Sequence, residues 1–184
     1  MILSFQEMFD LIVMTCVVGY IFMDMLVDEP RLLYMHGFDW RHFRLACLIS
    51  APAVVFHELA HKIVAVGLGL KATFHAAYGW LLFGAAMRML NTGLVFFVPG
   101  YVSIEAIQSP FEAALTAFAG PAVNGLLYLG ARLAMVKIPH MKIQTFRLLA
   151  MTRKLNGFLF LFNMIPVFGF DGENVLWGVM SWFS

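Results

Sequence analysis

Charged residues are scarce in this sequence of 184 residues. Asp, Glu, Lys and Arg make up 12% of the chain, whereas soluble domains carry about 25%. Hydrophobic residues make up 61%, and the mean hydropathy is +0.82. This composition excludes an ordinary soluble domain and indicates an integral membrane protein. The chain also lacks a polar stretch long enough for a separate soluble domain, so we expect a single domain over residues 1–184.

The sequence also has little net charge, few cysteines and no visible internal repeat. The formal net charge is only +1, so nothing indicates a nucleic-acid partner. Only two cysteines occur, Cys16 and Cys47, without a C-x-x-C motif, which excludes a cysteine-based metal site and predicts buried, reduced thiols. No internal repeat is visible, and this argues against a transporter built from inverted repeats.

Four segments are long and apolar enough to cross a bilayer, which takes about 20 residues of helix. They cover residues 8–27, 43–69, 110–136 and 145–166. The first lacks a basic leading region and a cleavage site, so we interpret it as a span rather than a signal peptide. Asp10 and Asp24 near its two ends are expected at the membrane interface. Ser109, followed by Pro110 and Glu112, predicts the start of the third span.

Two further segments are too short to span. Residues 71–104 contain two apolar runs separated by Asn91-Thr92-Gly93, and we expect a membrane-associated β-hairpin or re-entrant element there rather than a helix. A single span over residues 80–99 is the competing interpretation. Residues 172–183 predict a short closing helix. The expected fold class is therefore an all-α integral membrane protein, a polytopic helical bundle with a small membrane-associated β-hairpin or sheet.

The motif H-E-x-x-H lies within the second span, at His57, Glu58 and His61. Residues four apart lie on one face of a helix, so the two imidazoles can bind the same metal ion. The carboxylate of Glu58 falls beside that face, which suits a general base acting on water at the metal. The alternative is a pair of core histidines bonded to backbone carbonyls, but ionisable residues in apolar spans are usually functional.

A catalytic zinc site commonly has three protein ligands, so a third must come from elsewhere. Asp171 is the first candidate, because Gly169 and Gly172 beside it allow a tight turn that directs the carboxylate inward. His75 is the second candidate, because it follows soon after the motif. The remaining histidines lie in polar links and are expected to be solvated: His36, His42 and His140.

Two more motifs follow in the sequence. One is G-P-x-x-N, at Gly120, Pro121 and Asn124; the other is N-x-x-P-x-x-x-x-D-G, at Asn163, Pro166, Asp171 and Gly172. With H-E-x-x-H before them, they resemble the site-2 protease family of intramembrane zinc metalloproteases. The third motif of that family usually has Leu before its Asp and a small or basic residue after its Gly. This chain has Phe170 and Glu173 there instead.

The resemblance implies one zinc ion per chain, bound by His57, His61 and Asp171, with Glu58 activating the water. It implies that Asn163, with Asn124, orients substrate or stabilises the oxyanion. It also implies a β-hairpin between the metal helix and the G-P helix, whose edge can hold an unwound substrate by strand addition. The substrate expected from it is a transmembrane segment of a membrane-tethered regulatory protein.

The location predicted is a multi-pass position in the cell membrane, in contact with lipid and with the active site inside the bilayer. Basic residues in the links at 27–42 and 137–144 place the N-terminus outside by the positive-inside rule. The resemblance implies the opposite orientation, with the metal nearer the cytoplasmic face, and we give it slightly more weight.

Two rival functions fit part of the pattern. A transporter or ion-handling protein would use intramembrane charges along a pathway, and the candidates for it are Asp24, Glu58, Arg88, Arg132 and Asp171. A catalytically inactive membrane-embedded binding protein would keep the same scaffold. Tightly held stoichiometric zinc favours the protease over the transporter, and the intact ligand set argues against the inactive protein.

Overall fold

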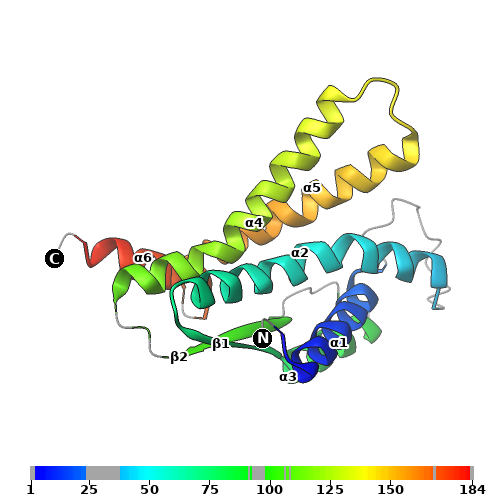
Figure 1. Ribbon diagram of the computed structural model, residues 1–184. Helices are drawn as coiled ribbons and strands as arrows, with labels where there is room; N and C mark the ends of the chain where they lie inside the picture. The colour runs from blue at the N-terminus through cyan, green and yellow to red at the C-terminus, as the bar shows by residue number, and fades with distance from the viewer. Residues whose placement is uncertain are drawn as a thin grey trace.

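The computed structural model describes residues 3–23, 38–90, 92, 98–105, 107, 109–167 and 169–182. In chain order these residues form α1 (Phe5–Phe22), α2 (Trp40–Gly67), β1 (Lys71–Ala76), α3 (Tyr78–Met89), β2 (Gly100–Glu105), α4 (Pro110–Lys137), α5 (Ile143–Asn163) and α6 (Asp171–Met180). Figure 1 shows α2 crossing the middle of the molecule, with the two strands and α1 on one side and α4 on the other. The predicted helical fold with a small sheet is confirmed.

Three of the described helices are long and apolar enough to cross a membrane: α1, α2 and α4. The two longer ones have 28 residues each, or about 42 Å at 1.5 Å per residue, which exceeds the ~30 Å of a hydrocarbon core. The segment predicted as a fourth span, 145–166, lies mostly in α5. This helix carries Arg147, Arg153 and Lys154 and is not among those three.

Local sequence signals explain where the helices begin. The Ser109 side chain accepts a hydrogen bond from the backbone of Glu112, the Glu112 side chain accepts one from the backbone of Ser109, and Pro110 follows. This capping box satisfies backbone donors that have no partner inside α4, as the sequence predicts. A second capping box, made by Ser4 and Glu7, begins α1.

The region 71–104 differs from the expected hairpin in one respect. Strands β1 and β2 do pair antiparallel, from Lys71 opposite Glu105 to Ala76 opposite Gly100. However, the first apolar run, interpreted as non-helical, forms α3. That interpretation was wrong because the run is rich in Leu, Ala and Met, which favour a helix even over a short length. The proposed turn at 91–93 lies mostly outside the described residues. Of the competing span over 80–99, residues 91 and 93–97 are outside them, and the earlier part lies in α3, which ends at Met89.

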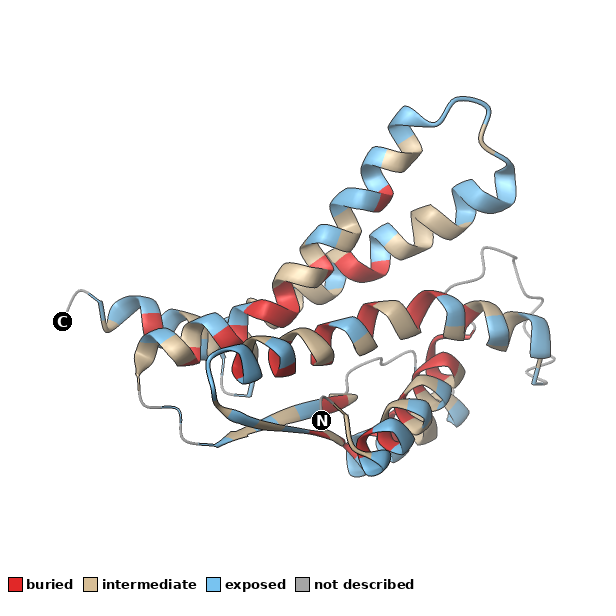
Figure 2. Ribbon diagram, viewed as in Figure 1, coloured by how far each residue is buried: buried red, intermediate tan, exposed pale blue. Residues whose placement is uncertain are grey.

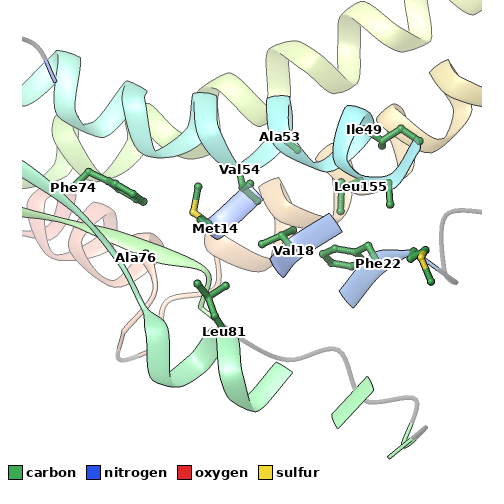
Figure 3. Close-up of a cluster of buried hydrophobic side chains, with 12 residues drawn as sticks. Met14, Val18, Phe22, Ile49, Ala53, Val54, Phe74, Ala76, Leu81 and Leu155 are labelled. Atoms are coloured by element: carbon green, nitrogen blue, oxygen red, sulfur yellow. The ribbon is translucent and has the colours of Figure 1, made fainter. Parts of the chain in front are cut away.

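The hydrophobic core lies where α1, α2 and the sheet meet. Met14 and Val18 of α1 are fully buried, together with Ala53 of α2, and Figure 3 shows them clustered with Phe74 of β1 and with side chains from α3 and α5. A Cβ added at Gly19 would lie 2.2 Å from the Sγ atom of Cys47. The glycine therefore allows the close approach of α1 to α2.

The prediction of buried cysteines needs correction. Both thiols are free, but Cys16 is exposed and Cys47 is half-buried. Asp10 is 3% exposed and accepts hydrogen bonds from strand β1 and from Tyr78, so it is a structural carboxylate within the protein. Its predicted counterpart Asp24 lies outside the described residues.

Helices α4 and α5 form a hairpin that extends away from α2 (Figure 1). Burial is concentrated where this hairpin meets α2, and its outer half is largely exposed (Figure 2). Large apolar side chains are exposed there, including Leu126 at 67% and Val136 at 78%. Soluble monomers rarely expose extended apolar surface, so this surface fits a helix that contacts lipid.

Candidate metal centre

The two histidines of H-E-x-x-H lie on the buried face of α2. His57 is 8% exposed and His61 is 7% exposed. They are one helical turn apart, and their Nε2 atoms are separated by 3.1 Å. The spacing read from the sequence therefore places both imidazoles at one point.

The other ring nitrogen of each histidine bonds to α4. The Nδ1 atom of His57 lies 2.6 Å from Oδ1 of Asn124, and the Nδ1 atom of His61 lies 2.7 Å from the carbonyl oxygen of Thr116. A carbonyl oxygen only accepts, so each Nδ1 carries the proton and donates it. Both Nε2 atoms are then left with a lone pair, the tautomer that binds a metal.

The other contacts of Asn124 fix its amide so that Oδ1 faces His57. Its Nδ2 atom donates to the carbonyl oxygen of Ala53 at 2.8 Å and to Oδ1 of Asn156 at 2.9 Å, which leaves Oδ1 as the atom facing His57. The side chain is completely buried. These contacts make Asn124 an orienting partner of a metal ligand, whereas the resemblance assigned it to substrate.

Asp171 comes from the other end of the chain to complete the group. Its Oδ2 atom is 3.3 Å from Nε2 of His57, and its Oδ1 atom is 3.5 Å from Nε2 of His61. Each carboxylate oxygen of Asp171 therefore faces the Nε2 lone pair of one histidine, an arrangement suited to a cation lying between them.

Two glycines direct Asp171 into the site. Gly169 has φ = +91°, a conformation that glycine adopts without strain, and it turns the chain just before α6 begins. A Cβ added at Gly172 would lie 2.5 Å from the carbonyl of Met164, so only glycine lets the start of α6 pack against the end of α5.

The donor set fits zinc. Two imidazole nitrogens and one carboxylate leave a fourth position for water in a catalytic zinc site. Zinc–ligand distances of about 2.0–2.1 Å in a tetrahedron place neighbouring ligand atoms ~3.3 Å apart. The two Nε2 atoms are 3.1 Å apart, and each lies 3.3 or 3.5 Å from one of the two Asp171 oxygens, which is close to that value.

The backbone of α4 forms one wall of the site at Gly120. A Cβ added there would lie 2.3 Å from Nε2 of His61 and 2.7 Å from Nε2 of His57. Any side chain would therefore occupy the space of the metal-binding atoms. The glycine of G-P-x-x-N is explained by this contact.

A cavity of about 300 Å³ opens beside the ligands. Glu58, which is 5% exposed, lines it together with the three ligands, and so do Asn163 and Asn174. Strand β2 contributes Gly100, Tyr101, Val102 and Ile104 to the wall. The cavity thus brings a candidate base, a metal-binding group and a strand to one place.

The other sequence candidates lie elsewhere. Among the described residues, the group able to hold a metal consists of His57, His61 and Asp171. His75 lies on β1 with its ring 5.4 Å from that of Tyr101, and His140 is exposed in the α4–α5 turn. His42 lies near Asp39, and His36 is outside the described residues. Glu173 turns back to accept a hydrogen bond from the backbone of Gly169.

Asn156 is a site residue that the sequence reasoning missed. It is completely buried on α5 and supports Asn124, which supports His57. Its local sequence carries little signal, because Asn156 closely follows the charged residues Arg153 and Lys154 of α5.

The contacts of Asn124 lead to a first prediction. We expect Asn124→Ala to weaken zinc affinity about 10- to 100-fold, because losing the partner of a metal-bound histidine typically has that effect. Asn156→Ala, which leaves the bond to His57 possible, should cause a smaller loss. Competition titration with a zinc chelator measures both affinities. Wild-type affinity in Asn124→Ala would contradict the orienting role.

The fold and this site define a class: a helical protein with helices able to span a membrane and a group of three side chains that could hold a metal ion. Comparison with known proteins agrees. The chain is 29% identical, over 182 residues, to a Methanocaldococcus jannaschii protein named "Putative zinc metalloprotease", covering 97% of this chain and 88% of the relative. It is 30% identical, over 141 residues, to a Synechocystis protein of the same name, covering 76% of this chain and 32% of the relative.

No family model and no solved structure matches the chain. The two relatives support a zinc metalloprotease. With three helices apolar enough to span a bilayer, they fit a membrane metalloprotease.

Proposed function

We propose that this chain is an intramembrane zinc metalloprotease of the site-2 protease type. It hydrolyses a peptide bond within or near a transmembrane segment of a membrane-tethered regulatory protein. The observation that carries the proposal is the convergence of His57, His61 and Asp171 on one point, beside Glu58, in a helical protein rich in exposed apolar surface.

The three ligands would hold a zinc ion, which when bound supplies Lewis acidity for the attack of water on a peptide carbonyl. Glu58 accepts the proton of the attacking water and then delivers it to the leaving amine. The proton lost by water is thus returned to the new N-terminus, and Glu58 ends the cycle unchanged. Glu58 is only 5% exposed, so little bulk water competes for this proton.

Asn163 is the better candidate for contact with the substrate carbonyl. Of the two asparagines suggested by the resemblance, Asn124 has its amide engaged by protein partners. Asn163 instead lines the cavity, where its side-chain N–H groups could donate to a developing oxyanion. In this proposal Asn124 orients the ligand His57, and Asn163 contacts the substrate.

Strand β2 supports binding of an extended substrate. It lies along the cavity wall and pairs with β1 on its other side. A peptide bond within a helix is shielded by the helix's own hydrogen bonds, so the substrate must unwind before cleavage. Addition of the unwound segment to the edge of β2 would supply backbone partners in place of those lost.

Zinc content tests the proposal directly. We expect about one zinc per wild-type chain and clear loss of zinc in Asp171→Ala, because two imidazoles alone make a weak site. The measurement is elemental analysis of purified protein against protein concentration. His75→Ala is the matched control and should retain zinc, since it lies on β1 outside the ligand group. Absence of metal in the wild type, or retention in Asp171→Ala, would remove the basis of the protease assignment and favour an ion-handling protein.

A further inference from the structure

A buried carboxylate at the start of α1 bonds to the sheet. Glu7 is 4% exposed, and its Oε1 atom accepts a hydrogen bond from the backbone N–H of Phe74 at 2.8 Å. The same oxygen pairs with the ammonium group of Lys62. Because Lys62 directly follows His61, Glu7 connects strand β1 to the helix that carries the metal ligands.

A second carboxylate repeats the arrangement one turn later. Asp10 accepts a hydrogen bond from the backbone N–H of Ala76 at 3.2 Å through Oδ2. Its Oδ1 atom accepts from the hydroxyl of Tyr78 at 2.7 Å. That hydrogen bond to Asp10 raises the pKa of Tyr78, so the hydroxyl stays protonated and remains a donor. Two residues spaced by one turn on α1 thus bond to two alternate amides of β1.

These bonds to β1 determine the edge to which the backbone groups of β2 point. Alternate residues of an antiparallel strand direct their backbone groups to opposite edges. Since Phe74 and Ala76 direct their amides to α1, the residues opposite them, Val102 and Gly100, direct theirs to the outer edge of β2. Both residues line the metal-site cavity. The edge of the sheet that α1 leaves open is therefore the edge at the site.

The sheet needs this support because it has only two strands. An isolated pair of strands is marginally stable, and each of its edges can pair with another chain. We propose that Glu7 and Asp10 are positioning residues for substrate. By occupying the outer amides of β1, they act as a substitute for a third strand, hold β2 against the cavity, and restrict strand addition to the edge beside the metal ligands. The claim about substrate rests on the function proposed above.

A purely structural role for the Glu7–Lys62 pair is the competing explanation. A buried ion pair is weak evidence for stability, because removing its charges often costs little if the space stays filled. What separates the two explanations is the amide acceptor. If the pair acts only as an ion pair, Gln and Met at position 7 should behave alike once Lys62 is neutral. If Glu7 holds the strand, only Gln preserves function.

Two double variants make this comparison. Glu7→Gln with Lys62→Met removes both charges but keeps an oxygen that accepts from the amide of Phe74. Glu7→Met with Lys62→Met removes that oxygen as well, and with it the acceptor for the backbone of Ser4 in the capping box; the Asp10 variants described below leave that capping box intact. We expect KM for a transmembrane peptide substrate to rise about tenfold in the second variant and to change little in the first, as losing one well-placed hydrogen bond implies. Zinc content and kcat should stay close to wild type in both.

Hydrogen exchange supplies a readout that does not depend on activity. Amides in peptides covering residues 71–76 and 100–105 should exchange faster in the Met variant and at the wild-type rate in the Gln variant. Equal exchange and equal KM in the two variants would overturn the proposal. If the wild type cleaves no substrate, the proposed protease function fails, but the exchange comparison still decides whether α1 holds the sheet.

Asp10 gives an independent pair if the Met variant does not fold. Asp10→Asn keeps an acceptor for the amide of Ala76, and Asp10→Leu does not. We expect Asp10→Leu to reproduce the faster exchange of both strands and the higher KM, and Asp10→Asn to resemble the wild type. Equal behaviour of Asn and Leu at this position would contradict the positioning role.

Discussion

Glu58→Gln is expected to retain zinc and lose proteolysis. The substitution keeps the size and most of the packing of a residue that is 5% exposed, and it leaves His57, His61 and Asp171 unchanged. It removes the group that accepts and returns the proton, a contribution of about 10²- to 10⁴-fold in rate. The measurement is cleavage of a transmembrane substrate in detergent or bilayer, alongside zinc per chain.

Glu173→Gln is the matched control for this experiment. Glu173 is the nearest acidic residue in sequence to Asp171, and its carboxylate accepts from the backbone of Gly169, a bond that the glutamine oxygen can also accept. We expect zinc content and cleavage near wild type. Full activity in Glu58→Gln would mean that another group is the base, and it would remove the catalytic role assigned to the second residue of H-E-x-x-H.

Gly120→Ala should eliminate metal binding, although the added group is one methyl. The Cβ would lie 2.3 Å from Nε2 of His61, far inside van der Waals contact, so either the imidazole or α4 must move. The histidines are held by Asn124 and by the carbonyl of Thr116 on the same helix, and moving α4 would break those bonds. We therefore expect zinc per chain to fall from about one to near zero.

Gly130→Ala separates this effect from a general response of α4 to alanine. A Cβ added at Gly130 meets no atom within 4 Å, and alanine is the better helix former by about 1 kcal/mol. The variant should keep zinc and unfold at the same or a higher temperature. Equal zinc content in Gly120→Ala and Gly130→Ala would show that the metal lies away from α4, contrary to the ligand geometry.

Much of the fold could be predicted because its signals are local. The apolar stretches corresponding to α1, α2 and α4 follow from the length of helix a bilayer requires, and the start of α4 follows from Ser109, Pro110 and Glu112. The error at α3 was also local. The shortness of the run was given more weight than its Leu, Ala and Met content, which favours a helix.

Half of the site could be predicted from local sequence as well. The positions of His57, Glu58 and His61 depend only on helix geometry, and the glycines around Asp171 indicated a turn. The sequence ranked Asp171 before His75, and the structure places Oδ2 of Asp171 3.3 Å from Nε2 of His57, whereas His75 belongs to the sheet. Asn124 changed from a presumed substrate contact to a partner of His57, because its bonds to Ala53 and Asn156 involve residues more than 30 positions away.

The sequence by itself indicated the apolar spans, the helix with H-E-x-x-H and the chemistry of its candidate ligands, since each depends on composition or on spacing within one helix. Tertiary structure alone decided how Asp171 reaches the two histidines, why residue 120 must be glycine, and that Glu7 and Asp10 are bonded to β1. The physical reason is distance along the chain. These contacts join segments 55 to 114 residues apart, and such pairings depend on how whole helices pack, which no local pattern encodes.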